Sequence, residues 1–144
     1  SPLFPFGFGK SYTDFHYDQL AVSVAGARQT LIISVEVRVT NIGDRSGIET
    51  VQLYLRDPVA RVARPVRELK AFEKVMLAPK DSRRVEFKLG IQDLAYHDGR
   101  SWFVEPGRFE WFVGSDSTAR LSCRMDLDAS QIGDEPLGDQ TASY

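Results

Sequence analysis

The sequence is poor in the residues that build most metal and redox centres. Its 144 residues include one cysteine, Cys123, and two histidines, His16 and His97. A single cysteine excludes a disulfide within the chain, and neither histidine has a second histidine or a cysteine at metal-ligand spacing. Cys123 falls in an alternating apolar pattern, which predicts a small buried thiol and not a reactive one. We therefore expect no metal site and no cofactor.

An excess of one charge and long apolar runs are also missing. The formal net charge is −2, from 18 basic and 20 acidic residues. This balance gives no reason to expect nucleic acid or an acidic membrane surface as a partner. No apolar run approaches the ~20 residues that a membrane helix needs. The first residue is not methionine and no signal peptide follows it, so we interpret the sequence as a cut from a longer polypeptide.

The usual signatures of catalysis are absent as well. Gly7 and Gly9 lie in no strand-to-helix context of the kind that a phosphate loop requires. Asp98-Gly99 is typical of a hairpin turn, which is a better interpretation than a general acid at Asp98. With 20 acidic residues some pair of carboxylates is inevitable, so such a pair identifies nothing by itself. The sequence predicts no catalytic residue.

The chain is dominated by a period of two. Apolar residues occupy alternate positions from Leu31 to Val39, from Val51 to Leu55 and from Ala119 to Leu127. This alternation predicts strands with one face in a core and the other mostly toward solvent. In a further candidate, Phe15 to Val24, the apolar face changes midway. We predict a β-bulge near Asp18-Gln19 that accounts for this change.

Turn residues separate the predicted strands. Examples are Asn41 to Gly47, Asp98-Gly99 and Glu105-Pro106-Gly107, whereas no stretch shows a convincing helical period. About seven short strands in a chain of this length predict an all-β fold, an antiparallel β-sandwich of the immunoglobulin or fibronectin type III kind. We divide the chain into a linker at 1–14, the sandwich domain at 15–127 and a polar C-terminal tail at 128–144.

Two segments suggest contacts with other molecules or domains. The N-terminal aromatics Phe4, Phe6 and Phe8 are costly as free surface, so they either fold back on the sandwich or anchor on a neighbouring domain. A sugar-stacking platform is a third interpretation. Residues 61–74 are rich in arginine and lysine. They predict either a loop and an amphipathic edge strand with solvated charges, or a docking surface in which Arg64 or Arg67 pairs a carboxylate.

Several motifs together resemble one known family. Residues 2–15, PLFPFGFGKSYTDF, are similar to the segment that joins the α/β sandwich domain of family 3 glycoside hydrolases to their C-terminal fibronectin type III-like domain. Residues 37–43, 47–54, 64–75 and 106–117 resemble further motifs of that domain, in the family's order. Lys10 stands where the family has leucine, and Ala71 where it has glycine.

The resemblance implies a non-catalytic accessory domain that braces the catalytic domains of a β-glucosidase-type enzyme. Such a parent removes terminal β-linked glucosyl or related residues with retention, and its catalytic carboxylates lie on other domains. The resemblance therefore assigns no catalytic residue of the family to any position of this sequence. The implied partners are the catalytic domains of the same chain, with a homodimer partner as a second candidate and with direct carbohydrate contact left open. The implied interdomain contacts are Phe4, Phe6, Phe8, Tyr12, Arg64 and Arg67.

Other interpretations remain beside this one. A carbohydrate-binding module would use Trp102 or Trp111 to stack on sugars, although both tryptophans fit a core or hairpin position better. An immunoglobulin-like interaction module would require the motif matches to be coincidental. The resemblance also implies a periplasmic or secreted parent enzyme.

Overall fold

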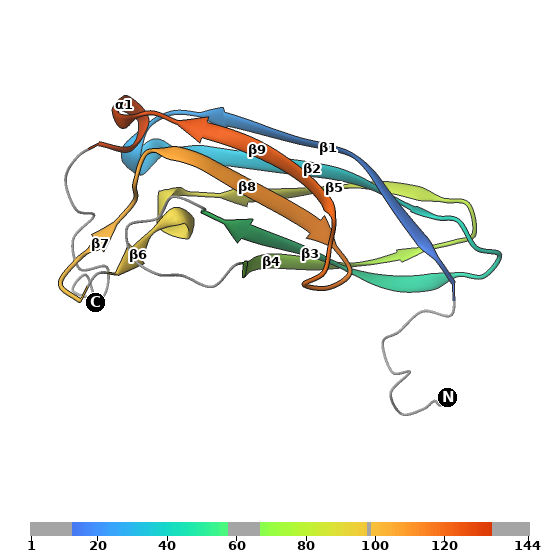
Figure 1. Ribbon diagram of the computed structural model, residues 1–144. Helices are drawn as coiled ribbons and strands as arrows, with labels where there is room; N and C mark the ends of the chain where they lie inside the picture. The colour runs from blue at the N-terminus through green and yellow to red at the C-terminus, as the bar shows by residue number, and fades with distance from the viewer. Residues whose placement is uncertain (1–12, 58–66, 98, 134–144) are drawn as a thin grey trace, which may run out of the picture.

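The computed structural model describes residues 13–57, 67–97 and 99–133, which form two packed antiparallel sheets (Figure 1). The first sheet has the order β1-β2-β5, where β1 is Phe15–Ala25, β2 is Ile32–Asn41 and β5 is Ser82–Leu89. The second has the order β4-β3-β8-β9, where β4 is Glu68–Leu77, β3 is Gly47–Arg56, β8 is Gly107–Gly114 and β9 is Leu121–Leu127. These seven strands confirm the predicted all-β sandwich.

Short elements lie at the ends of the sheets. A small hairpin is formed by β6 (Tyr96–His97) and β7 (Trp102–Phe103), as the turn signal at residues 98–99 predicts. Gly99 takes a φ of +101°, a conformation that glycine adopts readily. Two single 3-10 turns span Arg28–Thr30 and Ile91–Leu94. Neither of these turns continues into a longer helix, in keeping with the missing helical period.

The last described element is α1, Ala129–Ile132, which lies in the segment that we assign to a polar tail. Asp128 precedes it and accepts the backbone N–H of Gln131 at 3.1 Å, which is an N-cap. Ile132 is 2% exposed and packs in the core cluster. The packed part of the chain therefore extends past 127, at least to Ile132.

The face change in β1 is produced by the predicted bulge. Asp18 pairs with Arg38 and Ala21 with Glu36, so the register shifts between them. Gln19 takes a φ of +57° in this irregularity. The bulge lets Tyr17 before it and the apolar residues after it face the same core.

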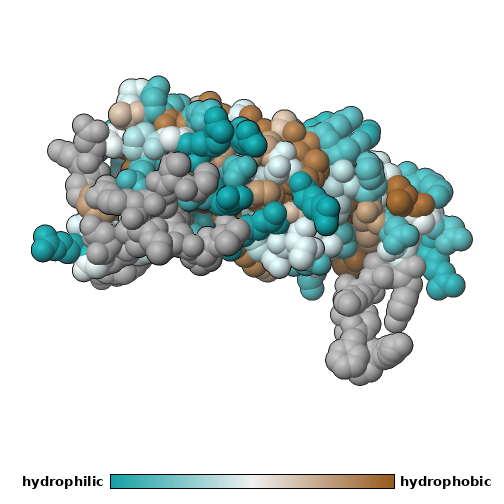
Figure 2. All heavy atoms as spheres, viewed as in Figure 1, coloured by the Kyte–Doolittle hydropathy of each residue, from teal (hydrophilic) through white to brown (hydrophobic). Residues whose placement is uncertain are grey.

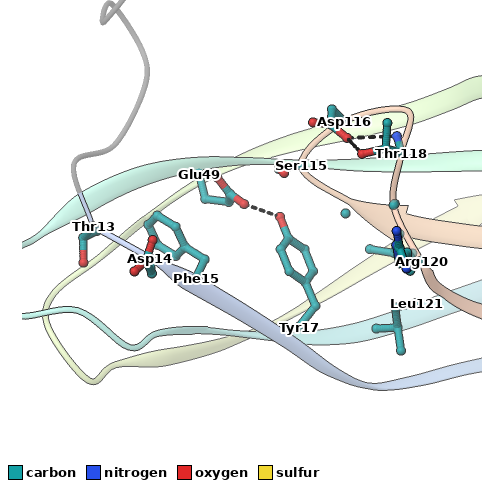
Figure 3. A pocket seen from close by; sticks show the side chains of 13 residues that line it. Thr13, Asp14, Phe15, Tyr17, Glu49, Ser115, Asp116, Thr118, Arg120 and Leu121 are labelled. Atoms are coloured by element: carbon teal, nitrogen blue, oxygen red, sulfur yellow. Dashed lines mark hydrogen bonds between the residues drawn. The ribbon is translucent and has the colours of Figure 1, made fainter. Parts of the chain in front are cut away.

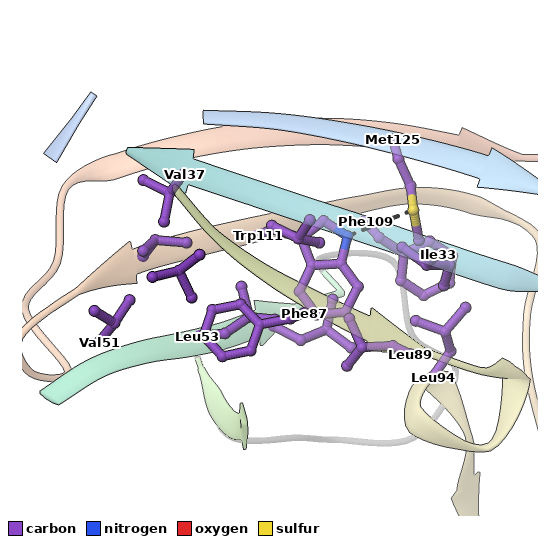
Figure 4. Packing of buried hydrophobic residues seen from close by; sticks show 14 of the residues in the cluster. Ile33, Val37, Val51, Leu53, Phe87, Leu89, Leu94, Phe109, Trp111 and Met125 are labelled. Carbon is purple, nitrogen blue, oxygen red and sulfur yellow. Dashed lines mark hydrogen bonds between the residues drawn. The ribbon is translucent and has the colours of Figure 1, made fainter. Parts of the chain in front are cut away.

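The core fills the space between the sheets (Figure 4). Phe109 and Trp111 of β8 are both fully buried there. The indole N–H of Trp111 donates to the Met125 sulfur at 3.4 Å, so its polar atom has a partner inside the core. Trp102 is partly buried against the same cluster. Both tryptophans thus occupy the core and hairpin positions that the sequence favours.

One buried amide holds the end of the sandwich at which β1 begins. Asn41 is fully buried and is the only asparagine in the sequence. Its amide nitrogen donates to the carbonyl oxygens of Arg45 at 2.7 Å and of Leu77 at 3.0 Å. Its side-chain oxygen accepts the Gly43 N–H at 3.0 Å and the Thr13 hydroxyl at 2.8 Å. The side chain therefore joins the start of β1, the β2–β3 turn and the end of β4.

The Asn41→Ala substitution should destabilise the domain strongly. It removes all four hydrogen bonds and leaves the Leu77 carbonyl without this donor, so we expect a loss of roughly 2–4 kcal/mol in the free energy of unfolding. Urea denaturation measures this loss. Thr40→Ala, at the half-buried neighbouring position, is the control. It removes only the hydrogen bond of 2.7 Å between the Thr40 and Ser82 hydroxyls and should change stability by about 1 kcal/mol or less. Equal losses for the two variants would contradict a special role for Asn41.

Candidate functional site

A pocket of about 420 Å³ opens beside the first residues of β1. Its walls come from three segments that are distant in sequence: residues 13–17, Glu49 of β3, and residues 113–121, which contain the β8–β9 hairpin turn. The side chains in these walls are shown in Figure 3. Because Thr13 is fixed by Asn41, the buried amide described above also fixes one edge of this pocket.

Tyr17 and Glu49 form the half-buried centre of the pocket. Their side chains point toward each other (Figure 3), and the Tyr17 hydroxyl donates to the Glu49 carboxylate at 2.6 Å. Burial raises the pKa of the Glu49 carboxyl above its ordinary value, although the hydrogen bond from Tyr17 lowers it and the charge of Asp116 raises it. Burial and the neighbouring Glu49 also raise the pKa of the Tyr17 hydroxyl.

Asp116 lies in the hairpin turn on the opposite wall. Its carboxylate accepts the hydroxyl of Thr118 at 2.6 Å and the backbone N–H of Thr118 at 2.9 Å. These hydrogen bonds lower the pKa of the Asp116 carboxyl. This arrangement is a local Asx-type turn, and it fixes the shape of the hairpin.

The pocket therefore holds two carboxyls whose pKa values are shifted in opposite directions. Such a difference is also found between the acid and the base of hydrolytic enzymes. Here each carboxylate already accepts hydrogen bonds that stabilise its own segment, Glu49 from β1 and Asp116 within its turn. The Tyr17–Glu49 contact fastens β1 to β3, and the Asp116–Thr118 contacts fix the shape of the hairpin turn. Burial accounts for the raised pKa of Glu49, and the hydrogen bonds from Thr118 account for the lowered pKa of Asp116, without a substrate.

Arg67 fastens the same hairpin from the outer surface of the sheet. Its guanidinium donates to the carbonyl oxygens of Ser117 at 2.9 Å and of Ala119 at 2.6 Å. It also lies over the Phe112 ring, 3.8 Å from the ring centre. Phe112 packs with Tyr54 and Ala119 in a small outer cluster that is separate from the main core. Arg67 thus covers this cluster and holds the turn that lines the pocket.

The predicted contact residues fall in different parts of the chain. Arg67 directly precedes β4, and its guanidinium donates a hydrogen bond within its own domain. Its contact with another domain stays a prediction. The other five lie outside the described residues: Phe4, Phe6, Phe8, Tyr12 and Arg64. The edge strand expected after the arginine-rich loop is confirmed, since β4 is the terminal strand of its sheet.

The pocket itself was not predicted. Glu49 faces inward on β3, as its pairing with the buried Val75 shows. The one sequence signal for it is an acidic residue among the inward-facing positions of a strand, where apolar side chains are expected.

Cys123 is half-buried against the core, and burial raises the pKa of its thiol to about 11. It is therefore an inert thiol, as expected.

Two further properties concern the described part of the chain. Within it, no group of three or more His, Cys, Asp or Glu side chains is placed to hold a metal ion. In that same part, no helix has the length and apolar character needed to cross a membrane.

Comparison with known proteins places this sandwich in a family. The model of the fibronectin type III-like domain matches residues 49–117. Thermostable β-glucosidase B of Acetivibrio thermocellus is 43% identical over 118 residues, which are 81% of this chain and 16% of the relative. β-Glucosidase 3B of Thermotoga neapolitana, solved in complex with glucose, matches with a TM-score of 0.75 and 37% identity, over 88% of this chain and 17% of that one.

The chain belongs to the fibronectin type III-like domains. The periplasmic β-glucosidase of Salmonella typhimurium is a further relative, 38% identical over 81% of this chain and 15% of its own length. The fibronectin type III-like domain thus spans about a sixth of the length of the β-glucosidases that it matches. The resemblance to family 3 glycoside hydrolases is confirmed.

Replacement of Glu49 should change how the stability of the fibronectin type III-like domain depends on pH. The raised pKa means that the folded state holds this proton more tightly than the unfolded state, whose carboxyl has its ordinary pKa of 4.5. Stability from this group is therefore present below about pH 4.5 and is lost as the pH rises through the folded pKa. We expect Glu49→Gln, which keeps an acceptor for Tyr17, to gain stability relative to the wild type between pH 3.5 and 7. Thermal melts across about that range measure the difference, and a constant difference would contradict the shift.

Removal of the Arg67 guanidinium should loosen the β8–β9 hairpin. Loss of two hydrogen bonds and of the contact with Phe112 predicts a decrease of roughly 1–3 kcal/mol for Arg67→Ala in urea denaturation. Arg67→Lys should recover little of this, because an ammonium lacks the planar fork. Arg108→Ala removes only an exposed ion pair with Asp126, at 3.6 Å, and serves as the control. If Arg67→Ala and Arg108→Ala lose the same stability, Arg67 does not hold the hairpin in solution.

Proposed function

We propose that this chain is the accessory domain of an exo-acting, retaining β-glucosidase-type enzyme, and that it braces the catalytic domains of that enzyme. The observation that carries the proposal is the 43% identity to a β-glucosidase over most of this chain and only a small part of the relative. A module that makes up about a sixth of the relative contributes to the enzyme through the parts to which it is attached. The chemistry of the described site, which fastens segments of the sandwich together, agrees with this role.

In this proposal each of the three predicted segments of the chain has its own role. Residues 1–14 connect the sandwich to the catalytic domains, and residues 15–127 form the accessory domain. In the segment 128–144 that we assign to the tail, α1 packs on the domain through Ile132. The aromatic residues at 4–12, Arg64 and Arg67 make the interdomain contacts in this proposal. We also place the parent enzyme in the periplasm or outside the cell, which the periplasmic relative from Salmonella supports.

The isolated chain should not hydrolyse an aryl β-glucoside, whereas the full-length parent should. Deletion of the domain from the parent should lower its thermal stability and with it the activity that remains after heating, because the bracing contacts are lost. A chromogenic assay on the three proteins tests this. Hydrolysis by the isolated chain, or a parent whose activity and stability are unaffected by the deletion, would contradict the proposal.

A carbohydrate-binding module is the alternative that the same proteins test. Trp111 is buried and Trp102 partly buried, so sugar should leave the tryptophan fluorescence of the isolated chain unchanged. A saturable change with soluble β-glucan would favour the alternative.

A further inference from the structure

The two outward faces of the sandwich differ in how their charges are arranged. On the β1-β2-β5 sheet the charged side chains pair with one another across and along the strands. Asp18 binds Arg38 through two hydrogen bonds of 2.6 and 2.9 Å, Glu36 lies 3.1 Å from Arg84, and Glu86 lies 3.7 Å from Lys88. Three cations and three anions of the described residues thus balance on this face, and each of the six lies in an ion pair within the domain.

The outward face of the β4-β3-β8-β9 sheet carries an exposed apolar strip. Paired residues of antiparallel strands point to the same face, and Ile48 pairs with Met76, while Phe72 pairs with Gln52. Phe72 and Met76 are each 63% exposed, Leu69 is 50% exposed and Ile48 is 37% exposed. We call these four residues the apolar strip. It runs along the β3–β4 pair toward the outer cluster that Arg67 covers.

The same face carries an excess of positive charge. Among the described residues of this face, five are cations and two are anions, although the whole chain has a net charge of −2. Glu110 is shared by two arginines, with Arg56 at 3.6 Å and Arg124 at 3.5 Å. Lys74 lies within the apolar strip, opposite Thr50 on β3. The five cations are Arg56, Arg67, Lys74, Arg108 and Arg124, and the two anions are Glu110 and Asp126.

A strip of this kind suits contact between domains of one chain. In Figure 2 apolar side chains reach the visible surface in patches among polar ones, and no single wide apolar face is seen. Interfaces between domains of a chain are more polar than permanent subunit interfaces. Apolar contacts flanked by charges provide both burial and selectivity for one partner.

We propose that the apolar strip and the cations beside it form the surface on which another part of the same β-glucosidase chain docks. The inference rests on the proposed function and names its contact surface. The docked part presents apolar side chains to Phe72 and Met76 and carboxylates to the cations around them. About five sixths of the length of the relatives lies outside this domain, so such a part has ample size.

A second copy of the domain is a poorer occupant. Two copies related by a two-fold axis would bring the same patch against itself. Each patch carries the same excess of cations, so the pairing would place like charges together in a water-poor contact. An acidic surface elsewhere in the chain has no such repulsion to overcome.

The two methionines of the sequence allow a direct test by oxidation. Met76 is 63% exposed and Met125 is 5% exposed, so mild hydrogen peroxide should oxidise Met76 in the isolated domain while Met125 reacts slowly. The domain has its own core and can be studied alone. In the full-length parent we expect Met76 to react at least about tenfold more slowly, because the docked surface covers it. Peptide mass spectrometry gives both rates, and Met125 is the internal control.

Two outcomes of the oxidation experiment would overturn the proposal. Equal rates of Met76 oxidation in the isolated domain and in the parent would mean that the strip stays exposed. Protection of Met76 in the isolated domain as its concentration rises would mean that a second copy covers the strip. β-Glucosidase activity is measured on the same parent sample. An active parent with an exposed Met76 would refute this surface while leaving the accessory function intact.

Binding in trans gives an independent measurement. The isolated domain is titrated into the parent chain truncated before this domain, and calorimetry reports the Kd. Phe72→Ser should weaken binding by roughly ten- to hundredfold, as expected for an aromatic anchor. Ile32→Ser replaces an apolar residue of similar exposure, 48%, on the other sheet and should bind like the wild type. Equal effects of the two substitutions, or none from either, would contradict docking through the strip.

Discussion

The side chain of Asn41 is the constraint on which the described site depends. A buried amide must satisfy its donors and acceptor inside the protein, and here its four partners come from three parts of the chain. Its backbone adds two bonds, accepting the N–H of Lys80 at 2.8 Å and donating to Asp81 at 2.9 Å. The β2–β3 turn, the β4–β5 turn and the chain entering β1 are thereby held together. Tyr17 lies four residues after Thr13 and donates to Glu49 from a strand whose start is fixed in this way.

A second set of contacts fixes the opposite wall of the pocket and connects it to the outer surface. Arg67 joins the β8–β9 turn to the start of β4 and shields Phe112 at the same time. The outer cluster that it covers lies next to the apolar strip of the same sheet. The β1-β2-β5 face, by contrast, satisfies its charges within itself. The described residues of the first face thus balance in charge, whereas those of the second carry an excess of cations and four exposed apolar side chains along β3 and β4.

The sequence predicted the features that depend on local pattern. Alternation identified the strands and the bulge after Asp18, because side-chain direction in a strand depends only on position along it. The pocket could not be predicted, because the partners Tyr17 and Glu49 are 32 residues apart and meet only when the sheets stack. The hairpin contacts of Arg67 were hidden for a different reason. They are made to backbone carbonyl oxygens, which every residue possesses and no sequence pattern marks.

An accessory domain without chemistry can still decide how well an enzyme works, provided that its contacts are selective. Burial of the apolar strip alone would favour any apolar surface, including that of another copy. The cations on the same face add a requirement for carboxylates in the partner, since an unpaired charge that loses its water is strongly unfavourable. Arg67 is held in place by its own hairpin, so its position is set before any partner arrives. A preorganised cationic edge beside an apolar strip therefore favours docking in one orientation, and a domain docked in one orientation is what bracing requires.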